Sequence, residues 1–212
     1  MVSCTMINTV LFDVDGTLLD TTEYIYQAFE HSLQKHHKPL TREHIGTIMG
    51  KPLEECYQIL TTKNDVSHLA QSHNDFQKEN PHLSFPFIHT LTVLHTLKEK
   101  KYNIAAVTTR RKNTAIDTLK KANILPFLDY VVTIDDVDNP KPHPEPILKA
   151  LDFLGVLPTE AIMVGDSPAD VQAGKNAGTK TIGVTYGFHG EKIRDENPDF
   201  VIDDISNLMA CL

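Results

Sequence analysis

The chain has 212 residues, of which 41% are hydrophobic and 7% are aromatic. This length and composition allow one well-buried core and a smaller subdomain, and nothing in them suggests disorder. Acidic residues outnumber basic ones by 28 to 20, which gives a formal net charge of -8 at pH 7. A protein that binds nucleic acid or an anionic membrane needs a basic face, so we expect neither kind of partner.

The cysteines, Cys4, Cys56 and Cys211, are scattered and odd in number. This pattern favours neither a disulfide framework nor a zinc cluster, and it suits a reducing compartment. The N-terminus lacks the basic region and apolar run of a secretion signal, and no later segment is long and apolar enough to span a bilayer. We therefore expect a cytoplasmic protein, either a monomer or a homodimer.

The first predicted element is a buried strand, an apolar run at residues 6–12 that ends in Asp13, Asp15 and Gly16. Neither carboxylate belongs inside a strand. Because ligands bind at the carboxyl ends of the strands in a parallel sheet, we expect chemistry at this point. Gly16 permits a sharp turn that can re-aim Asp15. One acid could then be a nucleophile or metal ligand while the other transfers protons.

Between residues 20 and 80 the apolar positions recur at spacings of three and four, which predicts helices. The predicted helices are one that is capped by Asp20 or Thr21 and ended by Pro39, one from Thr41 to Gly50, one over residues 52–60 and one over residues 66–79. Residues 80–87, which contain Pro81 and Pro86, then form a return linker.

From residue 88 onward, strand-like and helix-like segments alternate. The predicted strands are residues 103–108, 130–134, 161–164, 179–184 and 200–202. The predicted helices are one that contains Leu91, Leu94 and Leu97, then residues 113–122, 145–154 and 168–177, and a last one at the C-terminus. This alternation predicts an α/β fold with a parallel sheet covered on both faces. We expect a core domain of residues 1–19 and 82–212 and a helical cap domain of residues 20–81 that hangs over the acidic strand end.

The strand predicted at residues 103–108 ends in Thr108, Thr109, Arg110 and Arg111. A hydroxyl and nearby backbone amides at a strand end can hold a phosphoryl oxygen. Threonine is also a common strand residue, and exposed arginines usually only solvate a surface. These residues alone therefore leave a phosphate site and an ordinary strand end equally open.

Residues 139–146 contain four prolines around Lys141. Proline fixes φ and disfavours helix for the residue before it, so Lys141 stands in a stiff extended loop just before a helix. An ammonium group there could offset the charge of both an attacking carboxylate and a phosphate. The alternative is a solvated lysine in a turn, but the rigid frame favours a functional role.

A later strand of the core is followed by Asp166, Ser167, Pro168 and Asp170. Ser167 suits the cap of the next helix and Pro168 its first turn. Asp170 then lies in the first turn, where it either complements the helix dipole or supports a metal site from behind its ligands. Asp166 lies before the helix on the same sheet edge as Asp13, and these two carboxylates complete a cluster of hard oxygen ligands that suits Mg²⁺.

In the predicted cap, Gly50 and Pro52 place Lys51 in a turn that could dip toward the strand ends. Lys51 could bind an anionic leaving group such as a carboxylate or a second phosphate, and the alternative is an ordinary surface lysine. The 11 histidines lie largely in the cap without paired metal spacing, so we expect none of them to be a metal ligand.

In order along the chain, these segments resemble the four motifs of the haloacid dehalogenase-like (HAD) superfamily of phosphohydrolases. The resemblance implies that Asp13 attacks phosphorus, that Asp15 is the general acid and base, that Thr108 binds the transferring phosphate and that Lys141 steadies the nucleophile. It also implies that Asp13, the backbone carbonyl of Asp15 and Asp166 coordinate Mg²⁺. The implied fold is a Rossmann-like doubly wound parallel sheet with an inserted helical-bundle cap.

The resemblance extends to one branch of the superfamily. Dehalogenase members lack the second acid, so Asp15 favours phosphoryl chemistry. Over most of its length the chain resembles the branch of phosphoglycolate phosphatases and bacterial inorganic pyrophosphatases, and residues 132–137 with the loop around Lys141 are similar to the pyrophosphatases. This implies a Mg²⁺-dependent phosphohydrolase that acts on a small phosphorylated metabolite, a phosphoglycolate-like phosphomonoester or pyrophosphate, through an aspartyl-phosphate. A phosphosugar mutase and a non-catalytic phosphate-binding regulatory protein remain alternatives.

Overall fold

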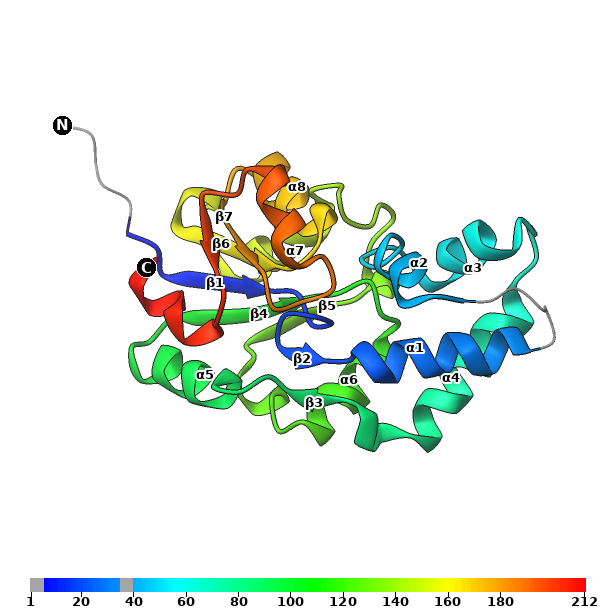
Figure 1. Ribbon diagram of the computed structural model, residues 1–212. Helices are drawn as coiled ribbons and strands as arrows, with labels where there is room; N and C mark the ends of the chain where they lie inside the picture. The colour runs from blue at the N-terminus through cyan, green and yellow to red at the C-terminus, as the bar shows by residue number, and fades with distance from the viewer. Residues whose placement is uncertain (1–5, 35–39) are drawn as a thin grey trace.

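The computed structural model describes residues 6–34 and 40–212, and within them a six-stranded parallel sheet forms the centre of the core (Figure 1). The strands lie in the order β5-β4-β1-β6-β7-β8, and each neighbouring pair is parallel. Their bounds are β1 Thr9–Phe12, β4 Asn103–Val107, β5 Tyr130–Val132, β6 Ala161–Gly165, β7 Lys180–Val184 and β8 Phe200–Ile202. The predicted doubly wound α/β fold is confirmed.

Helices cover both faces of this sheet. One face packs against α7 (Glu145–Leu154) and α8 (Pro168–Ala177), and the other packs against α5 (Thr90–Glu99), α6 (Lys112–Lys121) and the 3₁₀ helix η7 (Ile205–Ala210). Strand β1 contributes side chains to the hydrophobic clusters on both faces of the sheet, because successive side chains of a strand point to opposite faces. Val10 and Phe12 join the cluster with α5, whereas Leu11 joins the cluster with α7, and all three are completely buried.

A second group of helices lies beside the sheet at one end of the molecule, at the right in Figure 1. These helices are α1 (Thr22–Leu33), α2 (Arg42–Gly46), α3 (Leu53–Thr61) and α4 (Ser67–Glu79). They have a hydrophobic cluster of their own, in which Phe29, Tyr57 and Leu69 are almost fully buried. A separate cluster is what a distinct domain needs, and on this basis we propose residues 20–81 as the cap and the remainder as the core.

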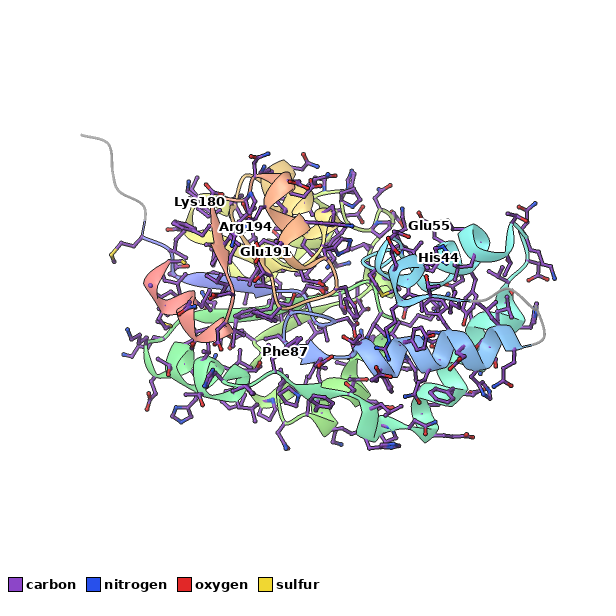
Figure 2. The ribbon with its side chains drawn as sticks, viewed as in Figure 1. His44, Glu55, Phe87, Lys180, Glu191 and Arg194 are labelled. Carbon is purple, nitrogen blue, oxygen red and sulfur yellow. The ribbon has the colours of Figure 1, made fainter. Side chains whose placement is uncertain are left out.

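The chain passes between the two groups through a short antiparallel ribbon, which the sequence did not reveal. Strand β2 (Leu19–Asp20) leaves the core and pairs with β3 (Phe85–Pro86), which returns to it. Just beyond β3, the Phe87 backbone N–H donates to the carbonyl of Leu18 at 3.2 Å, and the Phe87 ring packs against Tyr186 with centroids 4.7 Å apart. Figure 2 labels Phe87 in this linker region between core and cap. The predicted return linker is therefore partly ordered strand.

The element boundaries differ from the predicted ones mainly in the cap. The first helix ends at Leu33, and Pro39, the predicted terminator, lies outside the described residues. The second helix is shorter than predicted and stops at Gly46. Its cap is as expected, because the Thr41 hydroxyl accepts from the His44 backbone N–H at 3.2 Å.

Other differences concern 3₁₀ turns. The predicted C-terminal helix is the 3₁₀ helix η7, and β5 stops at Val132, before the 3₁₀ turn η4 (Ile134–Asp136). Within residues 6–34 and 40–212, the other 3₁₀ segments are η2 (Pro81–Leu83), η3 (Leu125–Phe127), η5 (Pro158–Glu160) and η6 (Gly190–Glu196). Such short turns have no apolar period of their own, so periodicity does not reveal them.

Two of the cysteines can be placed: Cys56 is buried, Cys211 is half-buried, and both are free thiols. Cys4 lies outside the described residues. Among the helices of the described part of the chain, none combines the length and the apolar character needed to cross a membrane.

Candidate active site

The strand order places the candidate site at a topological switch point of the sheet. Strand β1 lies between β4 and β6, and the chain builds one half of the sheet on each side of it. In an open parallel sheet, ligands bind in the crevice at the carboxyl ends of the strands where the order reverses. The ends of β1, β4 and β6 carry Asp13, Thr108 and Asp166 to this crevice.

The turn after β1 separates the two acids of the first motif. Asp13 still continues the ladder, since its backbone N–H donates to the carbonyl of Val164 at 2.9 Å. Gly16 then takes a left-handed conformation with φ 81°, which residues with a side chain rarely adopt. A Cβ at this position would also collide with the Asp166 carboxylate. Glycine therefore makes both the turn and the close approach of Asp166 possible.

Lys141 lies at the centre of the site and is almost fully buried. Its Nζ donates to Asp13 Oδ1 at 2.7 Å, to Asp170 Oδ1 at 2.6 Å and to the carbonyl of Val107 at 2.8 Å. Burial by itself would lower the pKa of Lys141, but the two carboxylates outweigh it and raise the pKa. Lys141 is therefore a fixed positive charge beside Asp13.

Asp170 joins this lysine to the start of α8. Its Oδ1 accepts from Lys141, and its Oδ2 accepts from both the backbone N–H of Ser167 at 3.0 Å and the Ser167 hydroxyl at 2.6 Å. This is the reciprocal arrangement of a capped helix N-terminus, with the acid one turn inside the helix. Asp170 thus does more than complement the helix dipole, because it also holds the ammonium group that contacts Asp13.

The donor set fits a divalent cation. Carboxylate oxygens of Asp13, Asp166 and Asp170 lie within 4.8 Å of one another, and all three residues are buried. Both oxygens of Asp170 already have partners, whereas Asp166 accepts only from the Phe188 backbone N–H, at 2.6 Å, among the contacts of the described residues. Burial, together with the charges of Asp13 and Asp170, raises the pKa of Asp166 well above its usual value. One lysine does not balance this buried charge, and an oxygen-binding cation between Asp13 and Asp166 would.

Replacing Asp166 with Asn should stabilise the metal-free protein at high pH. A buried carboxylate with a raised pKa binds more protons in the folded state than in the unfolded state, so its contribution to stability falls as the pH rises. We expect D166N to melt above the wild type at pH 8 in EDTA, by about 2–4 °C for each kcal/mol of relieved repulsion. The difference should shrink toward pH 5.

Addition of Mg²⁺ should reverse the order of the two proteins. The metal stabilises the wild type because it binds the folded state, whereas D166N lacks one of the ligands. Thermal melts at pH 5 and 8, with EDTA and with Mg²⁺, test both expectations. A melting temperature of D166N that rises with Mg²⁺ as much as that of the wild type would argue against Asp166 as a ligand.

Asp15 forms a bidentate ion pair with Arg110, the residue two positions after Thr108. Arg110 Nε donates to Asp15 Oδ2 and Nη2 donates to Asp15 Oδ1, both at 2.6 Å. The two side chains are only 9% and 19% exposed. Burial alone would raise the pKa of Asp15, but the guanidinium outweighs it and holds the pKa below its usual value.

A cavity opens between these strand ends and the cap. From the core, its polar lining consists of Asp13, Asp15, Thr109, Arg110, Arg111 and Thr114, and from the cap it consists of Lys51, Glu54, His73, Asn74 and Gln77. The apolar lining includes Ile25, Phe29, Met49 and Leu53. The acids of the first motif therefore share one cavity with side chains of the cap.

A family model described as "Haloacid dehalogenase-like hydrolase" matches residues 10–184 of this chain. The chain belongs to the haloacid dehalogenase-like hydrolases. It is 38% identical over 209 residues to "Pyrophosphatase PpaX" of Bacillus cereus, with 97% of this chain and 96% of that protein covered. It is also 38% identical over 208 residues to "Pyrophosphatase PpaX" of Bacillus pumilus, with 96% and 95% covered.

Solved structures of this HAD group share the fold. A haloacid dehalogenase-like family hydrolase from Streptococcus pneumoniae superposes with a TM-score of 0.84 at 26% identity, covering 97% of this chain and 98% of its own. The family resemblance inferred from the four motifs is thus confirmed.

The structure brings most of the predicted HAD site residues together. Asp13, Asp15 and Lys141 meet at the end of β1, and Asp166 lies beside them. Thr109 lines the cavity, whereas the hydroxyl of Thr108 accepts from the backbone N–H of Arg110 at 3.1 Å. The roles assigned to these side chains stay predictions.

Lys51 reaches the cavity from the cap, which the sequence could not decide. It lines the cavity and forms an ion pair with Glu55 at 2.6 Å, and its side chain is 43% exposed. Figure 2 labels Glu55 on α3, and Lys51 lies two residues before the first residue of this helix, Leu53. An incoming anion would therefore compete with Glu55 for Lys51.

His73 was not singled out from the sequence as a site residue, and it lines the cavity. It is almost fully buried, and its Nδ1 lies 3.0 Å from the hydroxyl of Tyr57. Burial lowers the pKa of His73 to about 3, so the ring is neutral at pH 7. The available signal was helical spacing, since His73 and Gln77 stand on the same face of α4 as buried Leu69. Polar residues on a buried helix face need hydrogen-bond partners, so this pattern predicts a polar environment around His73 and Gln77.

Proposed function

We propose that this HAD hydrolase is a Mg²⁺-dependent phosphohydrolase that acts on a small phosphorylated metabolite through a phosphoryl intermediate on Asp13. The observation that carries the proposal is the contact of Lys141 with Asp13, next to Asp166, at the wall of a cavity that the cap closes. A nucleophile, a fixed cation and a pair of carboxylates that can bind a metal ion are what phosphoryl transfer requires. We further expect a cytoplasmic enzyme, since Cys56 and Cys211 are free thiols.

Asp13 is positioned for attack by its partner. Lys141 holds Oδ1, and among the hydrogen bonds of the described residues none uses Oδ2. Oδ2 is therefore free to attack phosphorus, and the ammonium group offsets the charge of both the carboxylate and the phosphate. Mg²⁺ held by Asp13, Asp166 and the backbone carbonyl of Asp15 would neutralise further phosphate charge and orient it. Thr108 and Thr109, which follow β4, are the residues proposed to bind the phosphoryl oxygens, and of the two Thr109 lines the cavity.

Asp15 is the proposed general acid and base. In the first step it protonates the leaving oxygen while the bond between Asp13 and phosphorus forms. In the second step it removes a proton from water, which attacks phosphorus and releases phosphate from Asp13. The two steps need one proton carrier beside the nucleophile, and Asp15 follows Asp13 by two residues on the same cavity wall.

Pyrophosphate is the favoured substrate among those that the resemblance implies. Two relatives at 38% identity bear the name pyrophosphatase, and the cavity contains Lys51, Arg110 and Arg111, which suit a second phosphate. A phosphoglycolate-like phosphomonoester fits the same cations through its carboxylate. A regulatory protein would not need the nucleophile and lysine that this chain retains.

The test is phosphate release from pyrophosphate, phosphoglycolate and a panel of sugar phosphates. We expect pyrophosphate to give the highest kcat/KM in Mg²⁺ and EDTA to abolish turnover of every substrate, because no protein group replaces the metal. A mutase would isomerise a sugar phosphate without net phosphate release. A protein that binds these compounds and releases no phosphate from any of them would contradict the proposal.

A further inference from the structure

Arg110 occupies both carboxylate oxygens of the residue that we propose as general acid and base. Its Nε and Nη2 each donate to one oxygen of Asp15 at 2.6 Å, and the pair is largely buried. Asp15 therefore points toward the guanidinium, and each of its carboxylate oxygens accepts a hydrogen bond from Arg110. To contact a leaving oxygen in the cavity, Asp15 must give up at least part of this pairing.

Besides Asp15, the side chain of Arg110 has weaker contacts that hold it at the cavity. Its Nη1 donates weakly to the Thr118 hydroxyl at 3.4 Å, and its guanidinium carbon lies 5.4 Å from the centre of the Tyr24 ring. Its backbone N–H is fixed by Thr108, so the residue starts at the end of β4, and its side chain lines the cavity together with Asp15. The guanidinium therefore lies at the wall of the cavity, beside the space that a ligand would occupy.

We propose that Arg110 selects for substrates with an anionic leaving group, which takes the guanidinium from Asp15 and so frees Asp15 to face the leaving oxygen. This rests on the proposed phosphohydrolase function. An uncharged alcohol cannot replace a carboxylate in a bidentate pair with arginine, whereas a phosphate or a carboxylate can. The substrate class is therefore a phosphoryl compound whose leaving group carries phosphate or carboxylate close to the bridging oxygen.

The other two cations of the cavity lack this link to the chemistry. Arg111 pairs with Glu54 of α3 at 2.6 Å, and Lys51 pairs with Glu55. Arg111 also pairs with Asp135 of the core at 3.3 Å, and all of these ion pairs are much more exposed than the pair of Arg110. A ligand that exchanges with Glu54 or Glu55 changes only its own binding, whereas exchange at Arg110 also changes the state of the proposed proton carrier.

The experiment compares pyrophosphate, which has an anionic leaving group, with phenyl phosphate, whose leaving group carries no other charge. The proteins are the wild type, R110Q, R110K and the control K112Q, all in Mg²⁺. Lys112 is a neighbouring surface cation whose side chain is 64% exposed and which does not line the cavity. Far-UV circular dichroism and thermal melts report folding for each variant.

For R110Q we expect kcat/KM for pyrophosphate to fall about 100-fold, because a charged bidentate contact is lost, whereas kcat/KM for phenyl phosphate should stay the same or rise, because its leaving group cannot draw Arg110 away from Asp15 in the wild type. R110K keeps the charge but lacks the paired N–H donors of the guanidinium, so kcat/KM for pyrophosphate should fall about tenfold. K112Q should match the wild type on both substrates. The ratio of the two kcat/KM values is the readout, because a general loss of structure lowers both.

An equal fall on both substrates in R110Q, or an unchanged ratio in a folded R110K, overturns the assignment and leaves Arg110 as a support for Asp15 alone. If R110Q does not fold, R110K decides by the same ratio. Failure of the wild type to release phosphate from either substrate contradicts the phosphohydrolase function itself, which separates the two proposals.

Discussion

Replacement of Asp13 with Asn is expected to lower phosphate release from pyrophosphate by about 10⁴-fold or more, the size of effect seen when a catalytic nucleophile is removed. An amide oxygen is a poor nucleophile toward phosphorus and carries no charge to bind a cation. Asn also loses the ionic part of the contact with Lys141. The measurement is phosphate release in Mg²⁺, with circular dichroism to confirm that the variant is folded.

The neighbouring acid provides the contrast that identifies the attacking group. Asp15→Asn keeps the nucleophile, so with a good leaving group such as p-nitrophenol it should form the phosphorylated protein slowly and turn over poorly. Acid quench followed by peptide mass analysis should locate a phosphoryl group on Asp13 in D15N and in the wild type, and not in D13N. A phosphorylated D13N, or D13N that retains more than about one per cent of the turnover, would assign the attack to another group.

The catalytic edge of the sheet could be predicted because its signals are local. Asp13 and Asp166 each stand at the end of a short apolar strand, and the parallel arrangement of those strands follows from the alternation with helices. Lys141 was predicted from the prolines on both sides of it, which are also a local signal in the sequence. Once the fold class is known, these positions converge without knowledge of any side-chain contact.

Contacts between distant segments could not be predicted in this way. Arg110 follows Thr108 by two residues, but its pairing with Asp15 depends on how the turn at Gly16 re-aims that carboxylate. The ribbon of β2 and β3 pairs Asp20 with Phe85, far apart in the sequence, through strands of two residues each. Strands this short cannot carry a hydrophobic period. His73 was treated as one of many cap histidines because its burial appears only when α4 packs on α1 and α3.

Replacement of Lys141 with Met should destabilise the fold as well as the chemistry. The ammonium group is the shared partner of two buried carboxylates, Asp13 and Asp170, at 2.7 and 2.6 Å. Removing one side of a buried ion pair leaves an uncompensated charge and costs about 3–5 kcal/mol, although Met fills much of the same volume. Urea unfolding in EDTA measures this loss, and phosphate release in Mg²⁺ should fall by about 10²–10³-fold because Asp13 loses its orienting donor.

Lys180→Met is the matched control, because it removes a lysine from an ion pair at the surface. Lys180, labelled in Figure 2, donates to Asp199 at 2.7 Å with 56% of its side chain exposed. Exposed pairs contribute about 1 kcal/mol at most, so K180M should unfold close to the wild type. Equal destabilisation by K180M and K141M would mean that burial of the Lys141 pair has no special effect.

The pH dependence of K141M separates charge from packing. Burial raises the pKa of Asp13, and Lys141 is the main group that opposes this rise, so its removal should raise the pKa further. A carboxylate with a raised pKa in the folded state binds more protons there than in the unfolded chain, and its contribution to stability falls as the pH increases. The stability lost in K141M should therefore be larger at pH 8 than at pH 5. If the loss of stability is the same at pH 5 and pH 8, Lys141 stabilises the fold through the packing of its methylene chain, because packing does not titrate.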